Sequence, residues 1–314
     1  MQMGWTIMYV HGNGNKVRED LLKRQWDEAL FGQAMGALSR MAYWAPLRYP
    51  QPLADPEFDE IELLPTSPLE AASPSAAEAP EAFIAQTVLE AETAPAAGPE
   101  SAVVLEIGTP VGAEPLEAWL RGMTYEGDAL AQGENAAPPP TSPFEALPFP
   151  RPLRILAFRA LVKRTFKDVY AYFFGGFKQG MRQVVRDALR DLDGPVIVIG
   201  HSLGSIIAYD VLREQGSSSL DVSLFVTVGS PLGVTEVQDL VERPLVAPGP
   251  VTAWRNASDA RDLVAMDHTI RPEYAPVEKC TDFYVVNDSA THHGIREYLR
   301  AVPVRQPILE LFQR

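Results

Sequence analysis

The sequence predicts an α/β protein. Short apolar runs rich in β-branched residues recur along the chain, and segments with helical apolar spacing lie between them. In the clearest case, residues 195–212, an apolar run passes through a turn flanked by glycines directly into a helix-like pattern. The predicted strands, about six, are residues 5–10, 41–44, 196–199, 224–228, 250–256 and 281–286. With 314 residues, 46% of them hydrophobic, the chain can bury a substantial core.

The first predicted strand ends in the loop HGNGN, residues 11–15. Glycines allow the backbone of such a loop to turn inward and present its amides to a neighbouring group. Taken alone, the same residues also fit an ordinary Asn/Gly turn. We expect His11 to brace this loop. Residues 21–30 then have the spacing of an amphipathic helix and lead to the second predicted strand.

The third predicted strand continues into Gly200-His201-Ser202-Leu203-Gly204, which fits the pattern G-x-S-x-G. In a nucleophile elbow, the serine occupies a strained turn between strand and helix that exposes its hydroxyl above the sheet edge. Gly200 and Gly204 place no Cβ where strand and helix cross closely. The helix after Ser202 directs free N–H groups toward any negative charge that forms there. We therefore predict that Ser202 is a nucleophile; the alternative is a chance glycine-rich turn.

A nucleophilic serine also needs hydrogen-bond donors for the oxyanion of its reaction. With this type of elbow, one donor is the N–H that follows the nucleophile, here that of Leu203. The other comes from the loop after an early strand. We place it at the Asn13 N–H, with Gly12 shaping the turn. One such donor contributes about 10²–10³ in rate.

The general base should follow the last strand, because the order along the chain is serine, acid, histidine. His201 adjoins the nucleophile, and we expect its side chain to point away from the serine. His292 and His293 come after the last predicted strand and before a helix-like segment at residues 294–299. We predict His293 as the base, with His292 as the second candidate and His268 as the third.

The acid should follow the preceding strand, and Asp259 and Asp262 both do. Asp262 directly precedes the apolar pair Leu263-Val264, where the chain turns back into apolar packing. A buried carboxylate there would hold the imidazole tautomer and stabilise its cation. We favour Asp262. Asp259 is the alternative acid, or it caps a short helix.

Together these residues resemble serine hydrolases of the α/β-hydrolase fold, of the esterase/lipase type. The resemblance rests on the HG loop at His11, the GHSLG elbow around Ser202, the TVGSPLG run at residues 227–233, Asp262, and His293 ahead of Tyr298. It covers residues 1–45 and 150–300. It implies a mostly parallel sheet flanked by helices, and a Ser-Asp-His triad. Ser230, a possible rival nucleophile, is expected to be a turn residue without a helix behind it.

The chain divides into a predicted catalytic domain, residues 1–45 and 150–314, and an inserted lid or cap, residues 46–149. From residue 46 to 150 there are 18 acidic residues, two basic residues and 18 of the 28 prolines. Low-complexity sequence alternates there with helical spacing, which predicts a helical lid over the serine; a linker with incidental helices is the alternative. The segments concerned are 66–80 (low complexity), 81–92 and 116–130 (helices), and 138–140 (an extended linker). Helices are also predicted at residues 151–174 and 177–192.

Composition limits the class of ligand. The net charge of −14 and the absence of a basic cluster argue against nucleic-acid binding. An acidic insertion favours neutral esters over anionic substrates. The one cysteine, Cys280, is expected to be a buried apolar side chain, and no spacing typical of metal ligands occurs. We expect no metal and no organic cofactor. Neither a membrane span nor a signal peptide is predicted, which favours a cytoplasmic location.

The predicted function is therefore that of a serine carboxylesterase or lipase, which hydrolyses a small-molecule ester through an acyl-enzyme on Ser202. A thioesterase or acyltransferase with the same triad is the neighbouring alternative. A non-catalytic, hydrolase-like binding protein that uses the acidic insertion as its interaction surface is a third. Acyl-chain length, alcohol preference and oligomeric state stay open at this point.

Overall fold

Six strands form one sheet at the centre of the fold. The structure, a computed structural model, describes residues 5–55, 80–93, 121, 159, 162–163, 166–190, 192, 194–215, 220–262, 264–265 and 267–312. The strands are β1 (Thr6–Val10), β2 (Ser39–Ala42), β3 (Pro195–His201), β4 (Asp221–Val228), β5 (Val251–Ser258) and β6 (Cys280–Tyr284). Their order is β2-β1-β3-β4-β5-β6, and each neighbouring pair is parallel. The predicted α/β class is confirmed, and the sheet is parallel throughout.

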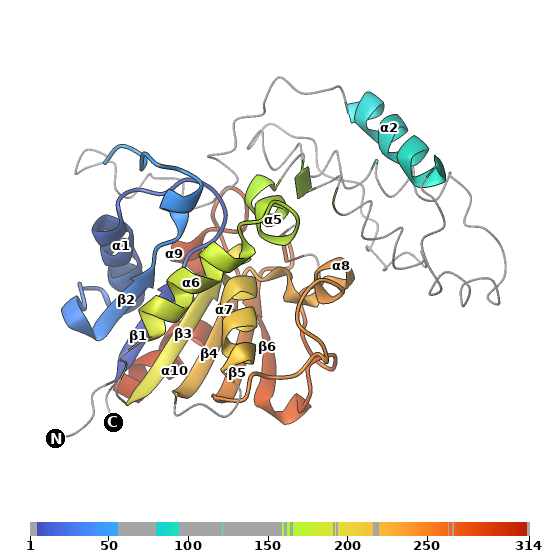
Figure 1. Ribbon diagram of the computed structural model, residues 1–314. Coiled ribbons are helices and arrows are strands. Elements are labelled where there is room, and N and C mark those ends of the chain that lie inside the picture. The colour runs from blue at the N-terminus through green and yellow to red at the C-terminus, as the bar shows by residue number, and fades with distance from the viewer. Residues whose placement is uncertain are drawn as a thin grey trace.

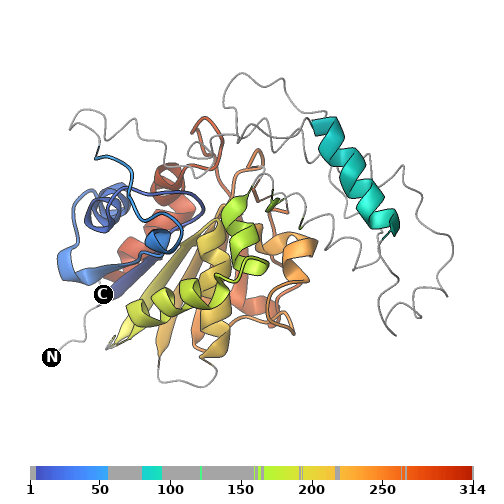
Figure 2. The ribbon, with the colours of Figure 1, turned by 45° about the horizontal axis from the view of Figure 1, so that its top comes forward.

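Helices cover both faces of the sheet (Figures 1 and 2). One face carries α1 (Glu19–Phe31), α9 (Ile295–Arg300) and α10 (Val302–Phe312), and the other carries α5 (Lys167–Phe173), α6 (Lys178–Leu189) and α7 (Leu203–Glu214). Side chains alternate along each strand. Met8 therefore packs with α6 and α7, whereas Ile7 packs with α1 and α9. The shorter helices are η1 (Gly36–Leu38), η2 (Ala45–Leu47), η5 (Pro231–Gly233), α8 (Thr235–Gln238) and η6 (Val277–Lys279).

The strand order reverses direction beside β1. The chain passes from β1 to β2 on one side and then returns to place β3 on the other side. In open parallel sheets, ligands bind beyond the carboxyl ends of the strands at such a switch point. The two loops that leave the sheet there are the HGNGN loop after β1 and the GHSLG turn after β3. The topology therefore places the two glycine-rich motifs side by side.

The predicted strand at residues 41–44 was displaced by two residues. β2 ends at Ala42, and Trp44 begins the turn into η2. The Trp44 N–H donates to His11 Nε2 at 3.1 Å, and its indole N–H donates to the His11 carbonyl at 2.9 Å. These long-range contacts remove Trp44 from the ladder. The last strand similarly ends at Tyr284, before the end predicted for it.

The helix predicted at residues 151–174 is not continuous: residues 159, 162–163 and 167–173 are helical, and Phe166 interrupts it. Phe166 has φ −118° and ψ 68°, outside the helical region, and α5 begins at Lys167. The first turn of α5 contains Asp168, whose carboxylate bonds to distant parts of the chain. Such contacts fix the start of a helix in a way that apolar periodicity does not reveal. The helix predicted at residues 177–192 forms as α6.

Part of the predicted insertion is described. Residues 81–92 were expected to be helical and form α2 (Pro80–Thr93). The low-complexity segment 66–79, residues 116–130 apart from Arg121, and residues 138–140 lie outside the described residues. Among the described helices, none is both long and apolar enough to cross a membrane.

Candidate active site

Ser202 occupies a strained turn between β3 and α7. Its φ is 53° and its ψ is −129°, a combination that residues other than glycine rarely adopt. The Ser202 N–H donates to the Val228 carbonyl at 3.1 Å, which anchors the turn to the end of β4. Strain of this kind persists only where the surroundings impose it.

Two glycines allow the strained turn to pack. A Cβ on Gly200 would lie 2.6 Å from Ser205 Cα, and a Cβ on Gly204 would lie 2.1 Å from the Val10 carbonyl oxygen. Both neighbours are backbone atoms, which cannot rotate away. The spacing of G-x-S-x-G in this chain is therefore a steric requirement, because β1, β3 and α7 approach one another backbone to backbone.

The buried hydroxyls of Ser205 and Ser230 stabilise the turn by hydrogen bonds. Ser205 Oγ donates to the Ser202 carbonyl at 2.5 Å. Ser230 Oγ lies 2.7 Å from Ser205 Oγ, and since the Ser205 proton is used, Ser230 is the donor. Ser230 is only 1% exposed and also accepts from the Leu232 N–H. Ser230 thus supports the elbow and caps η5.

The HGNGN loop lies directly against the serine. A Cβ on Gly12 would lie 2.8 Å from Ser202 Cβ. The N–H groups of Asn13 and Leu203, the two expected oxyanion donors, make no hydrogen bond within the described part of the chain. Both residues are buried. Two unoccupied amides therefore belong to the loops that border Ser202.

His11 fixes the orientation of the first of these amides. Its Nε2 accepts from the N–H groups of Trp44 and Ala45, so Nδ1 carries the proton and donates to the Gly12 carbonyl at 2.9 Å. Burial lowers the pKa of His11 well below its usual value, which keeps the ring neutral. The C=O and N–H of a trans peptide point in opposite directions. Holding the Gly12 carbonyl therefore also directs the Asn13 N–H.

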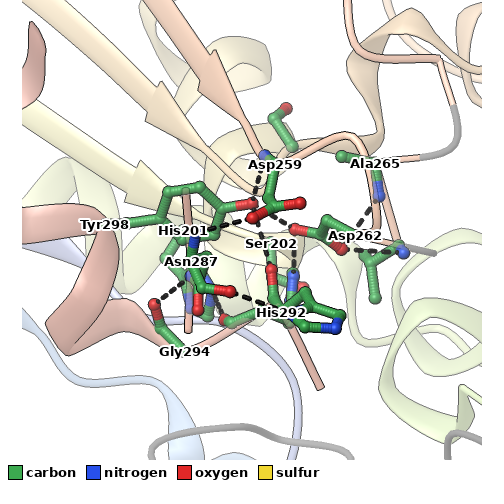
Figure 3. A network of polar contacts seen from close by, with 12 residues as sticks. His201, Ser202, Asp259, Asp262, Ala265, Asn287, His292, Gly294 and Tyr298 are labelled. Atoms are coloured by element: carbon green, nitrogen blue, oxygen red, sulfur yellow. Dashed lines mark hydrogen bonds and ion pairs between the residues drawn. The ribbon is translucent and has the colours of Figure 1, made fainter. Parts of the chain in front are cut away.

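Asp262 and His293 form a buried pair. His293 Nδ1 donates to Asp262 Oδ2 at 2.8 Å, and each side chain is at most 1% exposed. The Asp262 carboxylate also accepts from the Tyr298 hydroxyl at 2.5 Å and from the N–H groups of Val264 and Ala265. Figure 3 labels two of these donors, Tyr298 and Ala265, beside Asp262. Four donors fix the carboxylate and hence the tautomer of the imidazole.

The imidazole stands at the same end of β4 as the serine. A Cβ on Gly229 would lie 2.8 Å from His293 Nδ1, and Val228, one residue earlier, accepts from the Ser202 N–H. With its proton on Nδ1, neutral His293 has a lone pair on Nε2. Nε2 is buried and has no partner among the described residues. His293 Nε2, an acceptor without a partner, and Ser202 thus lie at the same end of the sheet. They make no direct hydrogen bond with each other in this structure.

His201 connects the elbow to this imidazole. Its Nε2 donates to the His293 carbonyl at 2.9 Å, and the two rings lie 4.5 Å apart between centroids. Burial, together with the neighbouring His293, lowers the pKa of His201 well below its usual value. Because His201 is neutral, it places no positive charge beside His293.

Asp259, the alternative acid, contacts other groups. Its carboxylate accepts from the Arg261 guanidinium at 3.0 Å and from the Asn287 N–H at 2.6 Å. Burial raises the pKa of Asp259, but the hydrogen bonds from Arg261 and Asn287 outweigh it and lower the pKa to about 2. Asp259 therefore ties the loop after β5 to the loop after β6.

The other histidines are also used elsewhere. His292 has φ 56°, and its Nδ1 donates to the Asn287 carbonyl at 2.8 Å. His268 packs its ring against Tyr284 at 5.9 Å. Cys280 is buried at the start of β6. Of the candidate histidines, His293 is the one that the described structure joins to Asp262.

Two charged residues next to the HGNGN loop, Lys16 and Asp168, were not predicted from the sequence. Lys16 Nζ donates to the carbonyls of the loop, and Asp168 accepts from the Gly14 N–H at 2.7 Å. A lone acid in the aromatic helix FKDVYAYFF is a detectable signal, since carboxylates are rarely buried without partners. For Lys16 no such signal exists in the sequence.

A cavity lies behind the loop, between α1 and the elbow. Its lining includes Gly12, Lys16, Gln25, Trp26 and His201. Trp26 Nε1 and Gln25 Nε2 are buried donors there without a partner among the described residues. The lining also includes the apolar side chains of Val17, Leu22, Leu53 and Ile295, and a water bound to the two donors would satisfy them.

No protein-family model matches this chain, and no curated protein or solved structure matches it.

Proposed function

We propose that this chain is a serine hydrolase of the α/β-hydrolase fold that cleaves neutral carboxylic esters. The observation that carries the proposal is the conformation of Ser202. A serine at φ 53° between a parallel strand and a helix, beside a buried His–Asp pair, is costly to fold and has a direct use as a nucleophile. The strand order and the position of the loops at its switch point support the same fold.

The proposed acylation step uses the groups at the edge of the sheet. Ser202 Oγ attacks the ester carbonyl carbon as His293 Nε2 removes the hydroxyl proton. The carbonyl oxygen becomes an oxyanion, which accepts from the N–H groups of Asn13 and Leu203. The tetrahedral intermediate then expels the alcohol, which receives the proton from His293. An acyl group remains on Ser202.

Deacylation repeats the sequence with water. His293 removes a proton from water, the hydroxide attacks the acyl carbon, and the carboxylic acid leaves as Ser202 regains its proton. In both steps the imidazole is transiently a cation. Asp262 stabilises this cation and holds the ring by its Nδ1–H. The N-terminus of α7 adds a favourable field at the oxyanion.

Neutral esters fit the charge of the chain best. The acidic residues concentrate between residues 46 and 150, the range predicted to border the serine. A field of this sign lowers the local concentration of anionic substrates. Uncharged short-chain esters are therefore the appropriate first substrates.

Covalent labelling tests the proposal. Wild-type protein should react with a fluorophosphonate probe and hydrolyse a short-chain 4-nitrophenyl ester, and Ser202→Ala should lose both properties. Ser223→Ala is a matched control, because Ser223 is a β4 serine whose hydroxyl donates only to Asp221. Wild-type labelling of Ser202→Ala, or no labelling of the wild type, would reject the mechanism. Products formed with a competing alcohol or thiol would separate hydrolysis from acyl transfer.

A further inference from the structure

The peptide that joins Asn13 to Gly14 is bound at both ends by charged side chains. Lys16 Nζ donates to the carbonyl of Asn13, and also lies 3.2 Å from the Gly14 carbonyl oxygen and 3.4 Å from that of Asn15. On the other side, Asp168 Oδ2 accepts from the Gly14 N–H at 2.7 Å. The Lys16 amino group thus holds the C=O of this peptide, and the Asp168 carboxylate holds its N–H.

The Asp168 carboxylate is itself rigidly placed. Asp168 is fully buried, and its Oδ1 accepts from Arg48 Nε at 3.0 Å. The Tyr49 hydroxyl lies 3.0 Å from Oδ2 and 3.1 Å from Oδ1. Asp168 lies on α5, and Arg48 and Tyr49 directly follow η2, so the carboxylate is held by a segment that is separate from the loop. It is a fixed point against which Gly14 is held.

The loop needs external restraints because of its composition. Gly14 has φ 85°, and glycine rotates freely between this region and others. A change in ψ of Asn13 or in φ of Gly14 that the other angle does not compensate moves the chain on either side of the Asn13–Gly14 peptide, and so displaces the neighbouring Gly12–Asn13 peptide that carries the oxyanion donor. His11 holds that neighbouring peptide by the Gly12 carbonyl. Lys16 and Asp168 hold the C=O and the N–H of the Asn13–Gly14 peptide, which prevents that displacement.

We propose that Lys16 and Asp168 are positioning residues that keep the Asn13 N–H aimed at the oxyanion of the reaction. This inference rests on the proposed function. The two side chains also act on each other: burial lowers the pKa of Lys16 to about 7, and the Asp168 charge opposes that shift. Neither residue touches the reacting atoms. Their effect on rate comes through the loop, because a misaligned oxyanion donor loses most of its contribution.

Asp27 provides a matched control for Asp168. It is also fully buried, and it accepts from a tyrosine hydroxyl (Tyr9, 3.0 Å), a basic side chain (Lys23, 3.2 Å) and a backbone N–H (Met35, 3.0 Å). Its partners also include the Ser39 hydroxyl at 2.9 Å, so they belong to α1, β1, the turn before β2 and β2 itself, and none of them is in the HGNGN loop. Asp→Asn at either site removes a buried charge with similar partners.

The test compares Asp168→Asn with Asp27→Asn in the full chain. For Asp168→Asn we expect kcat for a short-chain 4-nitrophenyl ester to fall about 10- to 100-fold, with KM changed less than threefold, since the oxyanion forms only in the reaction. A trifluoromethyl ketone, whose adduct with serine carries an oxyanion, should bind more weakly by a similar factor. Asp27→Asn should lower the melting temperature and leave kcat within twofold.

Equal losses of kcat in both Asp→Asn variants, or wild-type kcat in Asp168→Asn, would overturn the inference. If Asp168→Asn does not fold, Lys16→Met tests the other end of the peptide and should give the same fall in kcat without a change in KM; an unchanged kcat there would also overturn it. A wild-type protein that neither turns over ester nor reacts with fluorophosphonate would instead overturn the proposed function. The two failures are thus distinguishable.

Discussion

The elbow and the acid–base pair are built in different ways, although they meet at one sheet edge. The elbow is formed by consecutive residues, and its defining features are the missing Cβ atoms of Gly200 and Gly204. The acid–base pair consists of Asp262, from the loop after β5, and His293, from just before α9, and Tyr298 of α9 donates to the same carboxylate. Close backbone packing shapes the first region, and hydrogen bonds between distant side chains shape the second.

This difference determines how each region responds to substitution. A Cβ placed against backbone atoms cannot be accommodated without moving a strand or a helix. A lost hydrogen bond can be replaced in part by water or by a neighbouring group. Substitutions in the elbow should therefore abolish the fold of the site. Substitutions in the acid–base pair should lower the rate by an amount that depends on which hydrogen bond is lost.

Gly204→Ala should have the largest effect. Its Cβ would lie 2.1 Å from the Val10 carbonyl oxygen and 2.5 Å from that of His11, so α7 must move away from β1. We expect a loss of about 4 kcal/mol or more in the free energy of unfolding, and no labelling by fluorophosphonate. Urea unfolding and probe labelling measure both.

Gly180→Ala is the control for that substitution. Gly180 lies inside α6, and among the described residues its added Cβ would meet only Leu47 Cδ1, at 3.4 Å. Alanine is favoured over glycine in a helix by about 1 kcal/mol, so this variant should be as stable as the wild type or more stable. A folded, active Gly204→Ala would show that the packing of the elbow is not a steric limit.

Asp262→Asn should have the next largest effect, which falls on activity and not on the fold of the elbow. The carboxylate that holds the His293 Nδ1–H would be lost, and the ring would no longer be fixed in the required tautomer. A fall in kcat of about 10³–10⁴ is expected for this type of change. Asp259→Asn should leave kcat within about threefold. A larger loss in Asp259→Asn would reverse the assignment of the acid.

The sequence predicted the elbow well because its residues are neighbours in the chain. Their order alone specifies strand, turn and helix, and the structure places Ser202 at the turn. Asp262 and Asp259 could be ranked only weakly, since what separates them is the contact of Asp259 with Arg261 and Asn287. No spacing pattern shows such contacts. The same reason hid the Asp168 contact with Gly14.

The strands could also be predicted from local sequence, whereas their ends could not. Apolar runs located all the strands of the described sheet, because a strand buried on both faces has a composition of its own. The ends of these runs were less predictable. Trp44 is apolar and extends the second run, yet its bonds to His11 take it out of β2. Element ends are set by tertiary contacts, which composition does not record.

Tyr298→Phe should have a smaller effect on catalysis than Asp262→Asn. The Tyr298 hydroxyl donates to Asp262 Oδ2 and accepts from the Asp259 N–H at 3.0 Å. Without it, Asp262 keeps its other donors, so kcat should fall about tenfold or less. Stability should fall by about 1 kcal/mol. An unchanged kcat would show that the remaining donors of Asp262 suffice, and a fall as large as that of Asp262→Asn would make Tyr298 essential to the pair.

The smallest effect should appear in the acid stability of Asp259→Asn. The folded-state pKa of Asp259 is about 2, below the value of 3.8 for an unperturbed aspartate, so the ionised carboxylate stabilises the fold above pH 4. That contribution declines as the pH falls from about 4 toward 2, because the unfolded chain takes up the proton first. Urea unfolding at intervals from pH 6 to pH 3 should therefore show a steeper loss of stability in the wild type than in Asp259→Asn. Parallel losses would mean that Arg261 and Asn287 do not stabilise the charged carboxylate.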